Sequence, residues 1–171
     1  MIFMEQKERN VEDDLGAFLI SLVSQIKGQL KEYSENEVSI RPSDDKWSRK
    51  EILGHLVDSA CNNHRRFVIF REQDHLHFDG YDQEEWVKTQ QYADYDWTAL
   101  VDLWHAYNVH IGKVIQNIPA DLLEKETLDH NFDKVAFRRV PAGQPSSMQY
   151  FIKDYILHLQ HHIDQIHDET R

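Results

Sequence analysis

The chain has 171 residues, of which 40% are hydrophobic and 29% are charged, and its formal net charge is −11 at pH 7. These proportions are ordinary for a folded protein, and the negative charge argues against nucleic acid or an anionic membrane surface as a partner. No run approaches the roughly 20 apolar residues that a membrane-spanning helix needs.

Length and cysteine content point to one domain in a reducing compartment. We expect residues 1–171 to form a single domain with its own core, with residues 1–10 frayed. One cysteine, Cys61, excludes an intramolecular disulfide, and residues 1–14 lack the apolar core of a secretion signal. We therefore expect a cytoplasmic protein.

The first predicted element is an amphipathic helix from about Val11 to Ser34. Its apolar residues recur at the spacing of one helix face and should meet a core: Leu15, Phe18, Leu19, Leu22, Val23, Ile26 and Leu30. Residues 36–46 contain Pro42 among polar residues and are predicted to form a loop.

A second helix is predicted from about residue 48 to residue 73. It begins with a capping box, in which the Ser48 side chain accepts from the Glu51 amide and the Glu51 carboxylate accepts from the Ser48 amide. The residues expected to face the core are Ile52, Leu56, Ala60, Asn63 and Phe67. His55 lies at the edge of this face and is therefore available to the interior.

A third long helix is predicted over about residues 96–117, after an irregular stretch that holds a short helix near residues 83–89. The residues expected to lie inside the fold are Leu100, Leu103, Trp104, Tyr107, Ile111, Val114 and Ile118. Proline at positions 119, 141 and 145 predicts a long connection, in which weak alternation over residues 134–140 allows a short hairpin.

The last long helix is predicted to begin at a capping box over residues 146–149 and to run to about His167. Four long amphipathic helices without clear strand alternation predict an all-α protein, a four-helix bundle with long connections. There is no repeat at a fixed period and no low-complexity segment.

Two histidines in the last helix form a candidate metal site. His158 and His162 are four residues apart, so both rings leave the same face of the helix. His162 also follows the heptad spacing of the core residues, so it should point inward, where an unpaired imidazole costs free energy. Because bundle interiors are where facing helices build metal sites, we expect His55 to supply the third ligand.

Three neutral imidazoles suit zinc, nickel, iron or copper. Three protein ligands leave coordination positions open, which is typical of catalytic rather than structural zinc, and such an ion activates a bound water or thiol. His110, near the core line of the third helix, is the alternative to His55, and His161 is expected to face solvent or a second subunit. The other histidines are expected on the surface or in loops: His64, His75, His77, His105, His130 and His167.

Several residues that follow His55 are candidates for binding and catalysis. Asp58 has the position to orient a ligand or hold a metal-bound water, and its alternative interpretation is an exposed helix acid. Asn62 and Arg66 are candidates for binding an anionic substrate, although Arg66 would equally pair with an acid on a neighbouring helix. Cys61 is expected to be a small buried residue and not a nucleophile, because no adjacent base is evident.

Four stretches together resemble the DinB-like superfamily, and within it the YfiT-type branch of metal-dependent hydrolases. They are WSRKEILGHLVDS at residues 47–59, NNHRRF at 62–67, GYDQEEW at 80–86 and HLQHHIDQI at 158–166. The resemblance spans about residues 15–168. It implies a four-helix bundle, usually dimeric, that binds a divalent metal, often nickel or zinc, through one histidine of the second helix and two of the last. These match His55, His158 and His162.

The resemblance also suggests a reaction. Relatives include transferases and isomerases that use low-molecular-weight thiols such as bacillithiol, mycothiol or glutathione. We therefore expect a metal-dependent thiol transferase or hydrolase acting on a small molecule as a homodimer, with thiol transfer favoured by this analogy. One alternative is a non-enzymatic metal- or ligand-binding dimer in a stress response. Another is a bundle without metal, whose three imidazoles are far apart or hydrogen-bonded to carboxylates.

Overall fold

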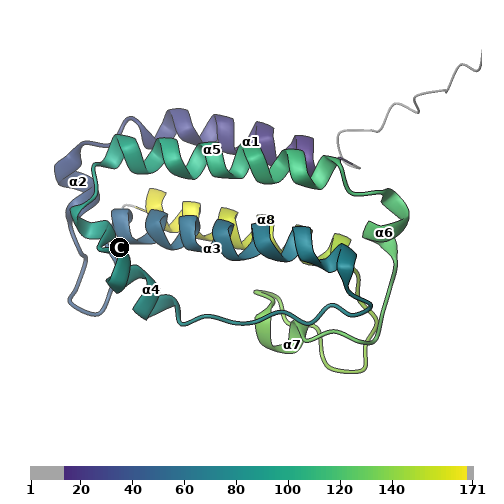
Figure 1. The fold of residues 1–171 in the computed structure, drawn as a ribbon. Coiled ribbons are helices and arrows are strands. Elements are labelled where there is room, and N and C mark those ends of the chain that lie inside the picture. The colour runs from purple at the N-terminus through teal and green to yellow at the C-terminus, as the bar shows by residue number, and fades with distance from the viewer. Residues whose placement is uncertain (1–13, 169–171) are drawn as a thin grey trace, which may run out of the picture.

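Four long helices form a bundle in the computed structural model, which describes residues 14–168 (Figure 1). They are α1 (Leu15–Leu30), α3 (Arg49–Ile69), α5 (Trp97–Gln116) and α8 (Met148–His167). Both α1 and α3 pack against α5 and α8, so α1 and α3 occupy diagonal corners. The chain runs one way in α1 and α8 and the opposite way in α3 and α5 (Figure 1). The predicted all-α four-helix bundle is confirmed.

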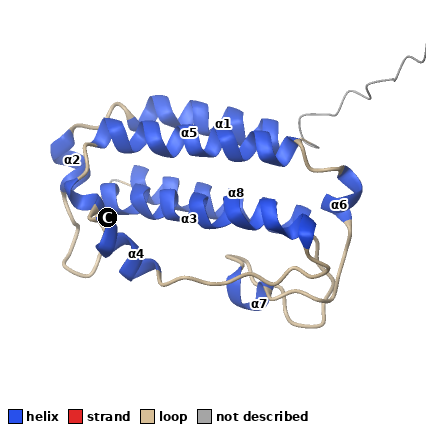
Figure 2. Cartoon of the chain, in the orientation of Figure 1, coloured by secondary structure: helices blue, strands red, loops and turns tan. Residues whose placement is uncertain are grey.

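Parallel neighbours such as α3 and α5 need a connection that travels the length of the bundle, and the long connections supply it. Between α3 and α5 lie η1 (Phe70–Glu72), α4 (Gln83–Gln90) and η2 (Tyr92–Asp94). The remaining short helices are α2 (Glu35–Ser39), α6 (Ala120–Glu124) and α7 (Phe132–Val135). No strand occurs within residues 14–168 (Figure 2).

The hairpin allowed over residues 134–140 is therefore wrong. The helix α7 covers the start of this segment, and the backbone amides of Phe137 and Arg138 donate to the carboxylate of Asp154, each at 2.7 Å. These amides bind a side chain of α8 instead of a partner strand. The loop predicted over residues 36–46 is also partly wrong, because α2 extends to Ser39.

The ends of the long helices are set by polar caps. Asp14 accepts from the amide of Ala17 at the start of α1, and Ser147, not Ser146, accepts from the amide of Tyr150 at the start of α8. The predicted start of the first helix at Val11 and the fraying of residues 1–10 lie outside the described residues. The predicted capping box of Ser48 and Glu51 is present at the start of α3.

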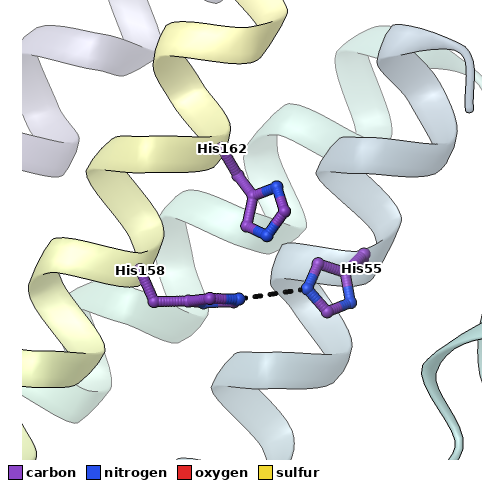
Figure 3. Close-up of side chains that lie close together, drawn as sticks. All are labelled: His55, His158 and His162. Carbon is purple, nitrogen blue, oxygen red and sulfur yellow. Dashed lines mark hydrogen bonds between the residues drawn. The ribbon is translucent and has the colours of Figure 1, made fainter. Parts of the chain in front are cut away.

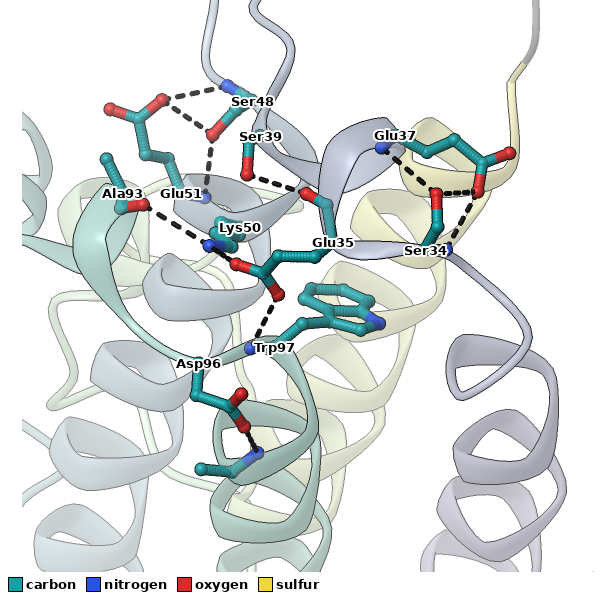
Figure 4. Close-up of polar contacts among 11 residues, drawn as sticks. Ser34, Glu35, Glu37, Ser39, Ser48, Lys50, Glu51, Ala93, Asp96 and Trp97 are labelled. Carbon is teal, nitrogen blue, oxygen red and sulfur yellow. Dashed lines mark hydrogen bonds and ion pairs between the residues drawn. The ribbon is translucent and has the colours of Figure 1, made fainter.

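A polar network joins α2, α3 and α5 at one end of the bundle (Figure 4). The Lys50 side chain, only 3% exposed, donates to the Glu35 carboxylate and to the carbonyl of Ala93. The second oxygen of Glu35 accepts from the backbone amide of Trp97 at 3.2 Å. One carboxylate of α2 therefore holds the first turns of α3 and α5 together.

Replacing Glu51 with alanine is expected to cost about 1–2 kcal/mol of folding stability at neutral pH, because it removes the capping box and the partner of Arg41. Burial raises the pKa of Glu51, but hydrogen bonds from Arg41 and Ser48 outweigh it, so the pKa lies below its ordinary 4.5. The carboxylate therefore stabilises the fold fully above about pH 4.5, and this contribution is lost as pH falls through the lowered folded value.

Urea denaturation from pH 7 to pH 3 measures this difference for Glu51→Ala, with Glu126→Ala, an exposed loop residue, as control. The difference in the free energy of unfolding between wild type and Glu51→Ala should narrow below about pH 4.5. A gap that stays constant over the whole range would contradict the ionic part of the explanation.

The predicted apolar faces meet in the interior, with few exceptions. The largest buried side chains include Trp104, Phe67, Leu19 and Leu56. Phe18 and Leu103 were expected inside but are 39% and 41% exposed, because each lies beside the packed face of its helix. Within residues 14–168, no helix is both long enough and apolar enough to cross a bilayer.

Candidate metal centre

The structure brings His55, His158 and His162 together in the interior of the bundle. His158 and His162 project from α8 toward His55 on α3 (Figure 3). One nitrogen from each ring lies within 4.8 Å of the others, and His55 Nε2 is 3.2 Å from His158 Nε2. The ring centroid of His162 lies 4.8 Å from the ring centroid of His55 and 4.5 Å from that of His158. The convergence predicted from the sequence is therefore present.

The spacing of these nitrogens fits a shared metal ion. Two nitrogens bound to one tetrahedral zinc ion at about 2.0–2.1 Å would lie about 3.3 Å apart. The separation of 3.2 Å between His55 and His158 is close to that value. His55 is fully buried, and its Nδ1 has no hydrogen-bond partner among the described residues. Bringing these groups together without a ligand costs free energy that a metal would offset.

Hydrogen bonds on the far side of two rings direct their Nε2 atoms toward the centre. His162 Nδ1 lies 2.8 Å from the carbonyl oxygen Oε1 of Gln165, which can only accept, so Nδ1 carries the proton. His158 Nδ1 lies 3.4 Å from the hydroxyl of Ser59. Such partners orient metal-binding histidines in known sites. None of the three rings hydrogen-bonds a carboxylate within residues 14–168, so the metal-free alternative loses both of its conditions.

Burial keeps the three imidazoles neutral. Burial, and to a smaller extent the neighbouring imidazoles, lowers the pKa of His55 to about 3 and that of His158 to about 2. Burial also lowers the pKa of His162, although the hydrogen bond with Gln165 opposes this shift. A metal needs the unprotonated form of each ligand, so the site is ready to bind at neutral pH.

Gln165→Ala is expected to weaken metal binding about 10–100-fold while leaving the three histidines in place, because it removes the acceptor that orients His162. Calorimetric titration of metal-free protein with zinc measures the affinity. Gln160→Ala, on the same helix but without a contact to the triad, is the control and should bind zinc as wild type does. An unchanged affinity in Gln165→Ala would contradict the orienting role.

A cavity of about 390 Å³ lies beside the histidines and is lined by His158 and His162. Its other walls are α3, with Ser59, residues 80–83 leading into α4, and residues 134–139 at the end of α7 and after it. The ring of Trp47 packs over His55 on another side, with centroids 5.2 Å apart. The cavity beside His158 and His162 leaves room for a small molecule next to the triad.

Asp58 and Asn62 lie on α3, as His55 does, but do not line this cavity. Asp58 is only 1% exposed, so its interpretation as an exposed helix acid is wrong. Its Oδ1 accepts from the hydroxyl of Tyr92 at 2.7 Å and from the Gln90 amide, its Oδ2 has no partner among the described residues, and burial raises its pKa. The Asn62 amide donates to the backbone carbonyl of Asp58 at 2.9 Å. Their proposed roles stay predictions.

Arg66 lines the cavity, and its role in substrate binding stays a prediction. Its side chain donates to the backbone carbonyl of Asp79 and to the Asn63 amide oxygen. The alternative partner, an acid on a neighbouring helix, is not found within the described part of the chain.

The other candidates are placed elsewhere. His110 is exposed on α5 and contacts the ring of His64, so it does not join the triad. Cys61 is exposed, so the expectation that it is buried was wrong. His130 lies between helices, as expected of a loop residue, but it is buried, and its Nε2 lies 2.7 Å from the carbonyl oxygen of Gln144. Gln165 was missed, although its position three residues after His162 places it on the same helix face.

Comparisons with known proteins agree with this geometry. The family model described as the DinB superfamily matches residues 26–166. The solved structure of YfiT from Bacillus subtilis, described as a probable metal-dependent hydrolase with an unusual four-helix bundle topology, superposes with a TM-score of 0.69. The superposition covers 96% of this chain and 89% of that chain at 14% sequence identity, so it establishes the fold. No curated protein sequence matches the chain.

Proposed function

This chain belongs to the DinB superfamily, and on that premise we propose that it is a metal-dependent enzyme whose ion is held by His55, His158 and His162. The observation that carries the proposal is the convergence of three neutral imidazoles within 4.8 Å of one another beside a cavity. Three imidazoles suit zinc, nickel, iron or copper, and the family resemblance favours zinc or nickel among them. Three protein ligands leave positions for a substrate or a water.

The residues around the triad have distinct tasks in this proposal. A bound divalent ion supplies a Lewis acid that lowers the pKa of a coordinated thiol or water. Gln165 holds His162 in the tautomer that leaves Nε2 free, and Ser59 contacts Nδ1 of His158 and orients its ring. Trp47 covers His55 and limits the access of water from that side.

Asp58 is the candidate for a buried proton acceptor. Its Oδ2 has no partner among the described residues, and burial raises its pKa above the ordinary value, which makes the carboxylate a better proton acceptor. The Tyr92 hydroxyl, which donates to Oδ1, fixes the orientation of the carboxyl group.

The reaction is proposed to be transfer of a low-molecular-weight thiol to an electrophile, or hydrolysis by a metal-activated water. The thiol reaction rests on the resemblance to thiol-dependent relatives. A cavity of about 390 Å³ is within the range of small-molecule sites and supports a small substrate for either reaction. A homodimer is part of the same proposal.

A non-enzymatic metal-binding bundle is the second candidate. It predicts a closed coordination sphere or no room for a guest, whereas the cavity lined by two of the three histidines favours an enzyme.

The experiment uses chelator-treated protein reloaded with zinc or nickel. Conjugation of glutathione or cysteine to 1-chloro-2,4-dinitrobenzene tests thiol transfer, and release of nitrophenol from 4-nitrophenyl acetate without thiol tests hydrolysis. Turnover that needs both metal and thiol assigns the transferase, and turnover that needs metal alone assigns the hydrolase. Metal bound at one ion per chain without either reaction favours the non-enzymatic bundle, and failure to bind zinc or nickel overturns the proposal.

A further inference from the structure

The Arg66 side chain is a buried cation without a carboxylate partner. Arg66 is 6% exposed, and none of the ion pairs found within residues 14–168 includes it. It donates to the backbone carbonyl of Asp79 at 2.5 Å and to the side-chain oxygen of Asn63 at 3.3 Å. The rings of Phe78 and Phe151 lie 6.0 and 5.7 Å from its guanidinium carbon. Neutral acceptors and ring faces compensate a buried charge only in part, so the site favours an added anion.

A chain of polar contacts links Arg66 to the triad along one side of α3. Arg66 donates to Asn63 Oδ1, and the Asn63 amide donates to Ser59 Oγ, each at 3.3 Å. Ser59 Oγ then lies 3.4 Å from His158 Nδ1. All four residues line the same cavity. From Ser59 to Arg66 is two turns of helix, about 10 Å along the axis, so the cavity joins the histidines to the guanidinium.

The cavity is cationic although the chain carries a net charge of −11. Lys134, in α7, and Arg139, on the segment that follows α7, line it together with Arg66. Asp154 is the one carboxylate lining it in the described part of the chain, and its two oxygens already accept the backbone amides of Phe137 and Arg138. Three cations therefore face one carboxylate that is already engaged, which favours an anionic guest.

We propose that the cavity binds an elongated small molecule with a metal-binding group at one end and an oxyanion, a carboxylate or a phosphoryl group, at the other. The metal-binding group reaches the ion held by His55, His158 and His162, and Arg66 holds the oxyanion. This inference rests on the proposed function, because it assumes an ion at the triad. A guanidinium forms strong charge-assisted hydrogen bonds to either oxyanion. Arg66 therefore selects for the anionic end of the substrate, while the histidines act at the other end.

The test uses cobalt-loaded protein and four hexanethiols that differ only at the far carbon: 6-mercaptohexanoic acid, 6-mercaptohexylphosphonic acid, 6-mercaptohexanol and 6-aminohexanethiol. Charge-transfer absorption of the cobalt–thiolate bond reports binding without any turnover. The acid or the phosphonate should bind at least about tenfold more tightly than the alcohol, and the amine should bind most weakly. The tighter of the two anions identifies the oxyanion that the site prefers.

Arg66→Gln keeps the length of a polar side chain but removes its charge, and it should abolish the preference for the anions. Arg65→Gln, an exposed neighbour on the same helix that does not line the cavity, is the matched control and should keep the preference. A preference that survives in Arg66→Gln would overturn the inference.

The wild-type series decides the question even if Arg66→Gln does not fold. Equal affinity for the alcohol and for both anions in wild type overturns the inference while cobalt–thiolate absorption leaves the metal centre intact. Failure of the protein to bind cobalt at all removes the proposed function, and the inference with it.

Discussion

His158→Ala should lose stoichiometric metal binding, with the affinity for zinc or nickel reduced by at least about a hundredfold. His158 is central to the triad, because its Nε2 lies 3.2 Å from His55 Nε2 and its ring centroid 4.5 Å from that of His162. Alanine leaves two imidazoles on different helices, which no longer surround one point. Metal content by mass spectrometry after dialysis, and calorimetric titration of metal-free protein, measure the loss.

The matched control is His110→Ala. His110 was the alternative to His55 from the sequence, but it is exposed on α5 and contacts His64. Its removal deletes an imidazole from a long helix without touching the triad, so metal content should match that of wild type. Equal metal content in His158→Ala and wild type would contradict the assignment of His158 as a ligand. Loss of metal in His110→Ala would indicate that His110 belongs to the metal site.

Gly54→Ala is expected to destabilise the fold by about 2 kcal/mol, although alanine is the better helix former by about 1 kcal/mol. A Cβ built on Gly54 would lie 2.2 Å from ring atoms of Tyr92. The ring must therefore move, and its hydroxyl would lose the 2.7 Å hydrogen bond to the buried carboxylate of Asp58. Overpacking and the loss of this buried hydrogen bond act in the same direction and outweigh helix propensity.

Thermal and urea unfolding measure this effect, and a loss of about 2 kcal/mol corresponds to about 4–8 °C for a chain of this length. Gly28→Ala is the control, because Gly28 is exposed in α1 and a Cβ there would meet nothing within 4 Å. That substitution should stabilise the fold by up to about 1 kcal/mol. The same sign of change at both positions would contradict the packing argument.

The sequence by itself determined the helices and the pairing of His158 with His162. Backbone hydrogen bonds set the rise and rotation per residue of a helix, so apolar spacing and capping residues identify an element from local information. The capping box of Ser48 and Glu51 and the heptad position of His162 are results of this kind. The prediction of a four-helix bundle follows from adding such elements together.

Tertiary structure decided what lies between the helices. The choice of His55 over His110 depends on which faces of α3, α5 and α8 meet, and this is settled by packing along their whole length. The exposure of Cys61, the closeness of Gly54 to Tyr92 and the burial of Arg66 without a carboxylate have the same origin. Spacing along one helix is fixed locally, whereas the distance between two helices depends on every side chain that separates them.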